Sequence, residues 1–287
     1  MKCLYHNDAD GICAGYWVWK SLLNPKKEDF IKINYDIKFP FEIIQADEEV
    51  WIVDYSIEPD EMRKLLNVTK NVIWIDHHKT AIDKYKDFEH HIEGIRLDGI
   101  AGCMLTYMHV LGRNSNIPVL QLVEQAPWFT KYIADFDVWK FEYGEKTKLF
   151  QIAFTAHNFE PWSKEWEKFY DGAWGYEYEL IQAGREMLKY RDGWAASVME
   201  VGFETDFEGY KCFAVNLPRC NSQFFDSVGG TDAYDILMPF YWNGQIWSVS
   251  LYSSSVDVSE IAKKYAGGGH KGASGFQVKE LPFRRNE

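Results

Sequence analysis

Short apolar runs that end on charged residues recur along the first half of this 287-residue chain. The clearest is 72–75, four β-branched or aromatic residues that predict a buried strand. This run leads directly into Asp76, His77 and His78. An acid and two imidazoles at the end of a strand are groups that can bind a metal ion.

Two further runs, 2–5 and 50–53, are strand-like and end at His6 and Asp54. Helical patterns follow both of these strands, and 30–35 is another strand-like run. Strands that alternate with helices predict an α/β fold with a mainly parallel sheet. Because ligand sites form at the carboxyl ends of such strands, we expect the polar residues there to converge.

The second half of the chain has a different pattern. Helical patterns cover 102–111 and 119–125, and the stretch 128–139 follows them. Strand-like runs lie at 196–201, 211–216, 234–241 and 245–251, and a helix is predicted at 256–265. A hairpin signal, Asn-Gly, separates two of these strands. We therefore expect two lobes: a domain over 1–160 with a mainly parallel sheet flanked by helices, a helical linker over 161–193, and a smaller α/β domain with a mixed sheet over 194–287.

Composition limits the classes of partner. The net charge is −12, the sequence pI is about 5.2, and there is no basic run, so we do not expect binding to duplex DNA. No apolar segment approaches ~18 residues, so we expect no membrane span. The five cysteines lack CxxC spacing, and a signal peptide is not evident, which favours a reduced protein in the cytoplasm.

The candidate metal ligands are carboxylates and imidazoles. Taken singly, each has a plainer explanation, such as a turn, a helix cap or a solvated surface. Together at the ends of successive strands they favour a site for Mn²⁺ or Mg²⁺, with Zn²⁺ or Co²⁺ as alternatives. Their number exceeds what one ion needs and suits two ions that share a carboxylate, an arrangement for in-line attack on phosphorus. The set is His6, Asp8, Asp10, Asp54, Asp76, His77 and His78.

A second candidate site is the glycine-rich run Gly267-Gly-Gly-His270-Lys271-Gly-Ala-Ser-Gly275. Such a run is often a flexible turn between a helix and a strand. Alternatively, its backbone N–H groups could approach an anion closely, with His270 and Lys271 adding positive charge. The run is therefore a candidate phosphate site.

These motifs together resemble the DHH phosphoesterase superfamily, which is named for the motif seen here at 76–78. The run His6-Asn-Asp8-Ala-Asp10-Gly is similar to the first motif of the family, Asp54 to its second, and the run at 267–275 to the signature of the DHH-associated C-terminal domain. The two domains account for nearly the whole chain. The likeness is to short bacterial enzymes of the oligoribonuclease (nanoRNase) and phosphoadenosine-phosphate phosphatase type.

The resemblance implies a role for each residue. One ion would be held by His6, Asp8 and Asp54, and a second by Asp10, Asp54, His77 and a fourth acid. Asp135 matches that fourth acid, with Asp137 as the alternative. His78 would lie beside the attacking water and the scissile phosphate, and Asp76 would orient His77. The groups that would act in catalysis are His78, Asp54 and His77.

In the second lobe, the resemblance implies that Gly268, Gly269, His270 and Lys271 bind a phosphate of the substrate. One position departs from the family pattern: many relatives have an arginine where this chain has Tyr252. A tyrosine lacks that charge but could stack on a base. Arg219 and Lys271 are candidate replacements for it.

We therefore expect a metal-dependent phosphodiesterase with two divalent ions, Mn²⁺ first and Mg²⁺ or Co²⁺ as alternatives. It would hydrolyse short single-stranded RNA to nucleoside monophosphates. Alternative substrates are phosphoadenosine phosphate, cyclic or linear dinucleotides and single-stranded DNA. A non-catalytic nucleotide sensor and a structural metal protein are competing classes, and a homodimer is a further expectation.

Overall fold

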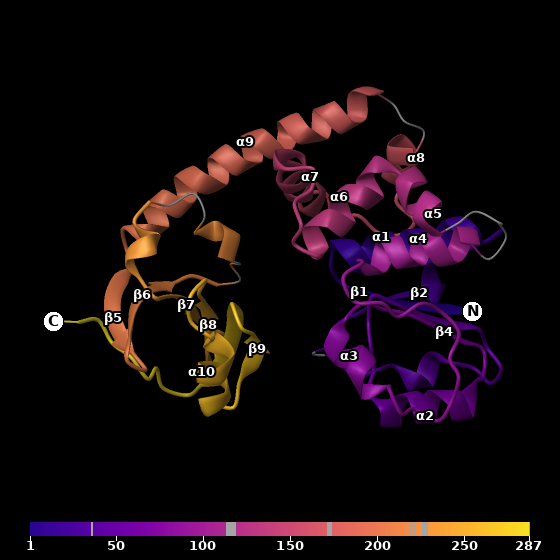
Figure 1. Cartoon of the computed structure of the whole chain (residues 1–287), viewed down its shortest axis with the longest axis horizontal. Helices are drawn as coiled ribbons and strands as arrows, with labels where there is room; N and C mark the ends of the chain where they lie inside the picture. Colours follow the sequence, from indigo (N-terminus) through magenta and orange to yellow (C-terminus); the bar gives the residue numbers. More distant parts are fainter. Residues whose placement is uncertain are drawn as a thin grey trace. The chain divides into compact units, whose positions relative to one another are not determined.

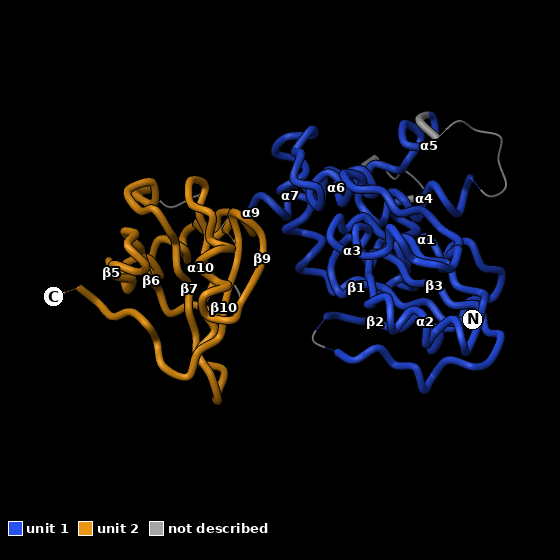
Figure 2. The backbone as a smooth tube through the Cα atoms, turned by 60° about the horizontal axis from the view of Figure 1, so that its bottom comes forward, with its two compact units in different colours: residues 1–186 blue, residues 187–287 orange. Residues whose placement is uncertain are grey.

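The computed structural model describes residues 1–35, 37–112, 119–170, 174–218, 220, 222–225 and 229–286. The chain forms two compact units, Met1–Glu186 and Met187–Glu287, coloured blue and orange in Figure 2. The predicted α/β fold with two lobes is confirmed. The boundary between the units along the chain falls within the long helix α9 (Trp174–Met199), and the domain limits given above stay a prediction.

Unit 1 is built on a four-stranded sheet in which all strands are parallel. Its order is β2 (Phe30–Ile33), β1 (Lys2–His6), β3 (Val50–Val53) and β4 (Val72–Ile75). Every residue of β3 and β4 is buried, because helices cover both faces of the sheet. This explains why these strands have continuous apolar sequences rather than alternating ones.

Helices α1 (Ala9–Ser21) and α4 (Gly102–Gly112) pack on each other and on the strands on one side of the sheet (Figure 1). On the other side, Met62, Leu65 and Leu66 of α2 (Pro59–Val68) share a core with the strand residues Leu4, Ile52 and Trp74. The remaining helices of the unit are α3 (Lys79–Lys84), α5 (Val119–Gln125), α6 (Trp128–Asp137), α7 (Glu145–Thr155) and α8 (Glu165–Tyr170).

Aromatic side chains bind the outer helices of unit 1 to α1. Tyr16 stacks on Trp166 of α8 with ring centroids 4.5 Å apart, and Trp17 stacks on Phe129 of α6 at 5.9 Å. Both tryptophans and Phe129 are almost fully buried. Stacking and buried area together fix the direction of α1, and the first turn of this helix carries two of the candidate metal ligands.

Unit 2 is a six-stranded mixed sheet in which only β6 and β7 pair in parallel. The helix α10 (Val258–Lys264) packs on β8, β9 and β10. In spatial order, the strands are β5 (Phe203–Phe207), β6 (Tyr210–Asn216), β7 (Ile236–Trp242), β8 (Trp247–Tyr252), β10 (Ala273–Val278) and β9 (Gly268–His270).

Two local predictions for unit 2 are wrong. The run 196–201 is not a strand, because α9 continues to Met199 and buries Ala195 against the sheet residues Phe213 and Val215. The glycine-rich run is not only a loop, because Gly268–His270 pairs with β10 as an edge strand. The predicted hairpin at Asn243-Gly244 is confirmed between β7 and β8.

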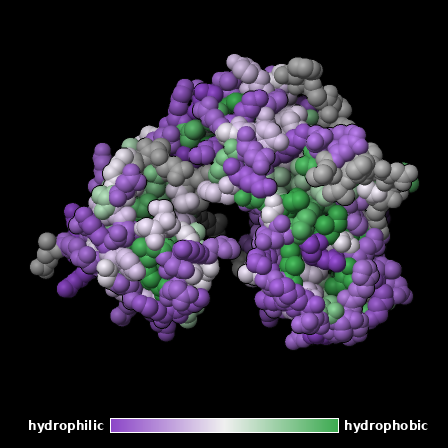
Figure 3. Space-filling model, in the orientation of Figure 1, coloured by the Kyte–Doolittle hydropathy of each residue, from purple (hydrophilic) through white to green (hydrophobic). Residues whose placement is uncertain are grey.

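The visible face of each unit is mostly hydrophilic, and hydrophobic residues show mainly near the middle of each unit (Figure 3). No helix among the described residues is both long and apolar enough to cross a membrane.

Candidate metal centre

The candidate ligands of unit 1 lie at the carboxyl ends of three adjacent strands. The register pairs Tyr5 of β1 with Val53 of β3, and Val53 with Ile75 of β4. The residues that follow these positions, His6, Asp54 and Asp76, are therefore neighbours. The backbone N–H of Asp54 donates to the carbonyl of Ile75 at 2.9 Å, so the chain stays paired to the end of the strand.

The first turn of α1 supplies two acids to the same edge. Asp8 caps the helix by accepting the backbone N–H of Gly11 at 2.9 Å. Asp10 is buried and accepts the backbone N–H groups of Gly102 (2.7 Å) and Cys103 (2.9 Å) at the start of α4. The partial positive charge of a helix N-terminus thus stabilises the Asp10 carboxylate, and this acid connects α1 to α4.

Asp54 is the most constrained residue of the site. Its φ of 53° lies in the left-handed region, which is rare outside glycine. Its carboxylate is buried, and neither oxygen has a hydrogen-bond donor among the residues that the structure describes. Nε2 of His77 lies 3.2 Å from Oδ1, and Nδ1 of His6 lies 3.7 Å from Oδ2. A buried, ionised carboxylate without a hydrogen-bond donor destabilises the fold unless a cation binds it.

A glycine is required beside this carboxylate. A β-carbon on Gly102 would lie 2.7 Å from Cβ of Asp54 and 2.9 Å from Oδ2 of Asp10. No ordinary side chain fits at that distance, so α4 can begin against the two acids only with glycine. Sequence analysis missed Gly102, and its place at the start of a helical pattern is the one signal that pointed to it.

The two histidines after β4 have different partners. Nε2 of His77 lies among Asp10, Asp54 and Asp137, at 3.7, 3.2 and 3.2 Å. Nδ1 of His78 instead lies 2.7 Å from Oδ1 of Asp76. The predicted role of Asp76 is therefore corrected: its carboxylate orients the imidazole of His78, and from His77 it accepts the backbone N–H, at 2.8 Å, and not the imidazole.

Asp137, rather than Asp135, reaches the cluster. The carboxylate of Asp135 accepts the hydroxyl of Thr147 and the backbone N–H of Glu142 at 2.8 Å, which ties the end of α6 to the start of α7. Asp137 lies beside His77, and its buried Oδ2 has no donor among the described residues. The prediction of Asp135 as the fourth acid does not fit this geometry, because the Asp135 carboxylate is hydrogen-bonded to Glu142 and Thr147.

Three groups of side chains bring ligand atoms close enough to hold a metal ion. Asp54 belongs to two of them, and so does His77. None of the three groups contains a thiolate, which suits hard or borderline divalent ions. The groups are Asp54 with His77 and His78, His6 with Asp8 and Asp54, and Asp10 with His77 and Asp137.

The charge of the cluster also favours a cation. Burial and the neighbouring Asp54 raise the pKa of Asp10, and burial with the charge of Asp8 raises the pKa of Asp54. Burial and Asp10 raise the pKa of Asp137 to about 8. Burial lowers the pKa of His6, but the nearby carboxylates of Asp54 and Asp8 outweigh it and bring the pKa to about 11. The residues fit a divalent metal centre because its charge would relieve this repulsion.

The pKa shifts predict how stability depends on pH. A carboxyl whose folded pKa is raised stabilises the fold most below its unfolded pKa, and that stability is lost as pH rises through the folded value. For Asp137 these limits are 3.8 and about 8, and Asp10 and Asp54 shift in the same direction. EDTA-treated protein should therefore melt at progressively lower temperature from pH 5 to pH 8.

Thermal melts at four pH values, with EDTA and with Mn²⁺, measure this effect. With Mn²⁺ the trend should reverse, because metal binding releases the protons that these carboxyls hold. The variant Asp137→Asn should show a shallower slope in EDTA. A melting temperature that is flat or rises with pH in EDTA would contradict the prediction.

A pair of variants tests the correction from Asp135 to Asp137. Asp137→Asn should lower the number of bound Mn²⁺ ions, measured by mass spectrometry of metal content, without lowering the melting temperature of the metal-free protein. Asp135→Asn should keep the metal content and lower the melting temperature by about 5 °C, because it weakens bonds to a charged acceptor worth about 1.5–3 kcal/mol each. The opposite pattern would restore Asp135 as the ligand.

The other predicted site residues belong to unit 2. Gly268, Gly269 and His270 form the exposed strand β9, and Lys271 lies in the turn to β10. Gly269 has φ of 141°, and a β-carbon there would lie 2.6 Å from the carbonyl oxygen of Ala273. The hairpin between β9 and β10 therefore requires glycine at this position for structural reasons alone. The phosphate-binding role of the run stays a prediction.

Tyr252 ends β8, and its hydroxyl donates to the carbonyl of Cys220 at 2.7 Å. This bond uses the hydroxyl hydrogen, so a contact with substrate would use the half-buried ring or a hydrogen bond accepted by the hydroxyl oxygen. Arg219, the other candidate for a charged contact, lies outside the described residues.

Comparison with known proteins supports the fold. No protein-family model matches the chain. The chain is 25% identical over 269 residues to the uncharacterized protein R106 of Acanthamoeba polyphaga mimivirus, a match that covers 88% of this chain and 59% of that protein. The chain thus spans about three-fifths of the length of this curated relative.

Two solved structures have a similar arrangement. A pGpG-specific phosphodiesterase, PggH from Vibrio cholerae, matches with a TM-score of 0.52 and 13% identity, over 97% of this chain and 94% of that chain. An exopolyphosphatase-related protein from Bacteroides fragilis matches with a TM-score of 0.50 and 14% identity, over 98% and 87%. The chain therefore shares the two-lobed fold of these two structures.

Proposed function

We propose that this protein is a metal-dependent phosphodiesterase that hydrolyses short oligonucleotides to nucleoside monophosphates with two divalent ions, Mn²⁺ first. The observation that carries the proposal is the position of Asp54. Its buried carboxylate belongs to two of the three groups of ligands and has no other partner among the described residues. A carboxylate in this position suits a bridge between two ions, which is the arrangement used for phosphoryl transfer.

The side chains divide into two sets of ligands. His6, Asp8 and Asp54 would hold one ion, and Asp10, Asp54, His77 and Asp137 the other. When bound, two such ions stabilise charge on the phosphoryl oxygens and lower the pKa of water, so that hydroxide is available near neutral pH. The protein contributes the rigid positions of these groups, which come from three strand ends, the start of α1 and the end of α6.

His78 is the group best placed to contact the substrate. Burial lowers its pKa, but the hydrogen bond and charge of Asp76 outweigh this and raise the pKa. The raised pKa favours the protonated imidazole, which is about one third exposed. It could donate a hydrogen bond to a phosphoryl oxygen. In the hydrolysis, oxygen from water bonds to phosphorus as the ester P–O bond breaks, and the leaving oxygen must gain a proton, which His78 could supply.

Two further observations support a small substrate. The net charge of −12 disfavours a long polyanion, so binding must rest on local contacts. A protein of the same fold is a pGpG-specific phosphodiesterase.

A substrate panel with Mn²⁺ tests the proposal. Short RNA, short DNA, linear and cyclic dinucleotides and phosphoadenosine phosphate would be incubated with the full chain, and products separated by chromatography. We expect nucleoside monophosphates from di- to pentanucleotides of RNA and no product after EDTA treatment. A folded, Mn²⁺-loaded protein that leaves every substrate intact would rule out the hydrolase.

A further inference from the structure

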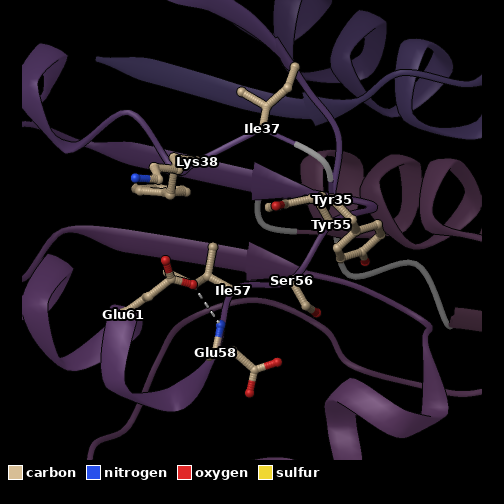
Figure 4. A pocket seen from close by; sticks show the side chains of 9 residues that line it. Tyr35, Ile37, Lys38, Tyr55, Ser56, Ile57, Glu58 and Glu61 are labelled. Atoms are coloured by element: carbon tan, nitrogen blue, oxygen red, sulfur yellow. Dashed lines mark hydrogen bonds between the residues drawn. The ribbon is translucent and has the colours of Figure 1, made fainter. Parts of the chain in front are cut away.

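A cavity of about 330 Å³ lies beside the metal centre in unit 1, and none of the candidate ligands lines it. Its walls come from the segment after β2 and from the segment between β3 and α2 (Figure 4). The volume is at the lower end of the range for small-molecule sites, ~300–1,000 Å³. The residues used below are Tyr35, Tyr55, Lys38, Glu58 and Glu61.

The cavity is continuous with the candidate metal centre along the chain and in space. Tyr55 directly follows Asp54. The Tyr35 ring lies 5.5 Å from the ring of His6 and 6.3 Å from that of His78, measured between centroids. A molecule with a phosphate at the ligand cluster could therefore place its next group in the cavity.

Two tyrosine rings form one side of the cavity, and Figure 4 shows them together. Their centroids are 4.7 Å apart, and the ring planes meet at 30°. Tyr55 is 4% exposed, whereas Tyr35 is 55% exposed. Tyr55 thus acts as a fixed support, and Tyr35 keeps much of its ring open to solvent. An open aromatic ring that is held in place is the usual surface for stacking a nucleobase.

Acidic side chains stand across the cavity from these rings. Figure 4 shows Glu61 and Glu58 on the side away from the tyrosines. Glu61 uses Oε2 to accept the backbone N–H of Glu58 at 3.2 Å, and Glu58 pairs with Lys84. An ionised carboxylate only accepts hydrogen bonds and has sites for several donors. Lys38 also lines the cavity and Lys84 offsets the charge of Glu58, so the wall does not exclude a phosphate. The Glu61 carboxylate favours a neutral group with N–H donors.

We propose that this cavity binds the nucleobase of the nucleotide whose phosphate lies at the metal centre. The base stacks on Tyr35, and its amino or imino edge faces Glu61. The proposal rests on the function proposed above and gives it a substrate class: nucleotides with a purine next to the scissile phosphate, guanine first, because guanine offers two adjacent N–H donors. Inorganic phosphate chains, which have no base, gain nothing from the cavity.

Steady-state kinetics on a guanine dinucleotide test the stacking contact. Tyr35→Ala should raise KM about tenfold with a smaller change in kcat, the size expected for the loss of one stacked base. Tyr35→Phe keeps an aromatic face and should lie closer to the wild type. The matched control is Tyr178→Ala, which removes a tyrosine that is 66% exposed on α9. An equal KM for Tyr35→Ala and the control would overturn the proposal.

A substrate without bases separates stacking from damage to the metal centre. On an abasic dinucleotide analogue, wild type and Tyr35→Ala should have equal kcat/KM. A loss of the same size on this analogue would mean that Tyr35 acts on the centre itself, and the base site would be withdrawn.

Glu61→Gln tests the acidic wall. Glutamine still fits the capping box at the start of α2, so the helix should remain. The variant should lose the preference for guanine over a pyrimidine at this position. An unchanged preference would contradict the assignment of Glu61.

A binding measurement distinguishes failure of this inference from failure of the proposed function. Guanosine, which carries no phosphate, would be added to EDTA-treated protein, and saturation transfer to its base proton would be recorded by NMR. We expect transfer with the wild type and with Tyr178→Ala, and its loss in Tyr35→Ala. If the wild type hydrolyses nothing but shows this pattern, the hydrolase fails and the base site stands. Transfer that is absent, or that survives Tyr35→Ala, overturns the base site.

Discussion

Asp54→Asn should abolish hydrolysis, with a loss of at least about a thousandfold in kcat. Metal ions at such centres contribute several kcal/mol to the transition state, and each ~1.4 kcal/mol is a factor of ten. The amide is nearly isosteric but lacks the charge that two of the ligand groups share. Activity on a short RNA measures the loss in kcat, and mass spectrometry of metal content measures the loss of bound ions.

The same variant should be more stable than the wild type when metal is absent. It removes a buried charge that has no hydrogen-bond donor among the described residues and that raises the pKa of Asp10. In EDTA, its melting temperature should rise by a few degrees, since ~1 kcal/mol shifts a unit of this size by about 2–4 °C. Added Mn²⁺ should stabilise the wild type and leave the variant unchanged. A variant that is less stable in EDTA and keeps its metal would show that Asp54 is structural.

Gly102→Ala should have the second largest effect, although glycine contributes no ligand atom. The new β-carbon would lie 2.7 Å from Cβ of Asp54, so α4 or the carboxylates must move. Overpacking of this kind costs about 1–3 kcal/mol. We expect affinity for Mn²⁺, measured by calorimetry, to fall about ten- to a hundredfold, as when groups that orient ligands are changed.

The matched control for this variant is Gly112→Ala in the same helix. Among the described residues, a β-carbon there would meet Cδ1 of Leu122 alone, at 3.7 Å, which is an ordinary contact. Its metal affinity should equal that of the wild type. Equal affinities for the two alanine variants would show that the close approach at Gly102 does not shape the centre.

The sequence predicted the parts of unit 1 that depend on local pattern. The runs at 50–53 and 72–75 are apolar throughout, and both are strands buried on two faces. Parallel pairing then brings the residues after them together, which is why His6, Asp54 and His77 could be placed at one sheet edge from sequence alone. The continuous apolar runs and the parallel direction of the strands were sufficient to predict this arrangement.

Three features depended on packing that sequence does not reveal. Asp135 and Asp137 are two positions apart near the end of α6, and only the helix direction decides which of them faces His77. The run 196–201 is apolar enough for a strand, but it ends a helix that packs on the sheet of unit 2. The requirement for glycine at 102 arises from two acids that are 48 and 92 positions away along the chain.

The double role of Asp10 has a consequence for how such proteins lose activity in evolution. Its carboxylate accepts the first N–H groups of α4 while it also faces the ligand cluster. Asp54 and Asp137 have no such bonds to the backbone among the described residues. A descendant that gave up catalysis would lose those two acids at little cost to folding and would keep Asp10. Within such a lineage, an aspartate at this position would be evidence of ancestry, and the acids at 54 and 137 would be evidence of an enzyme.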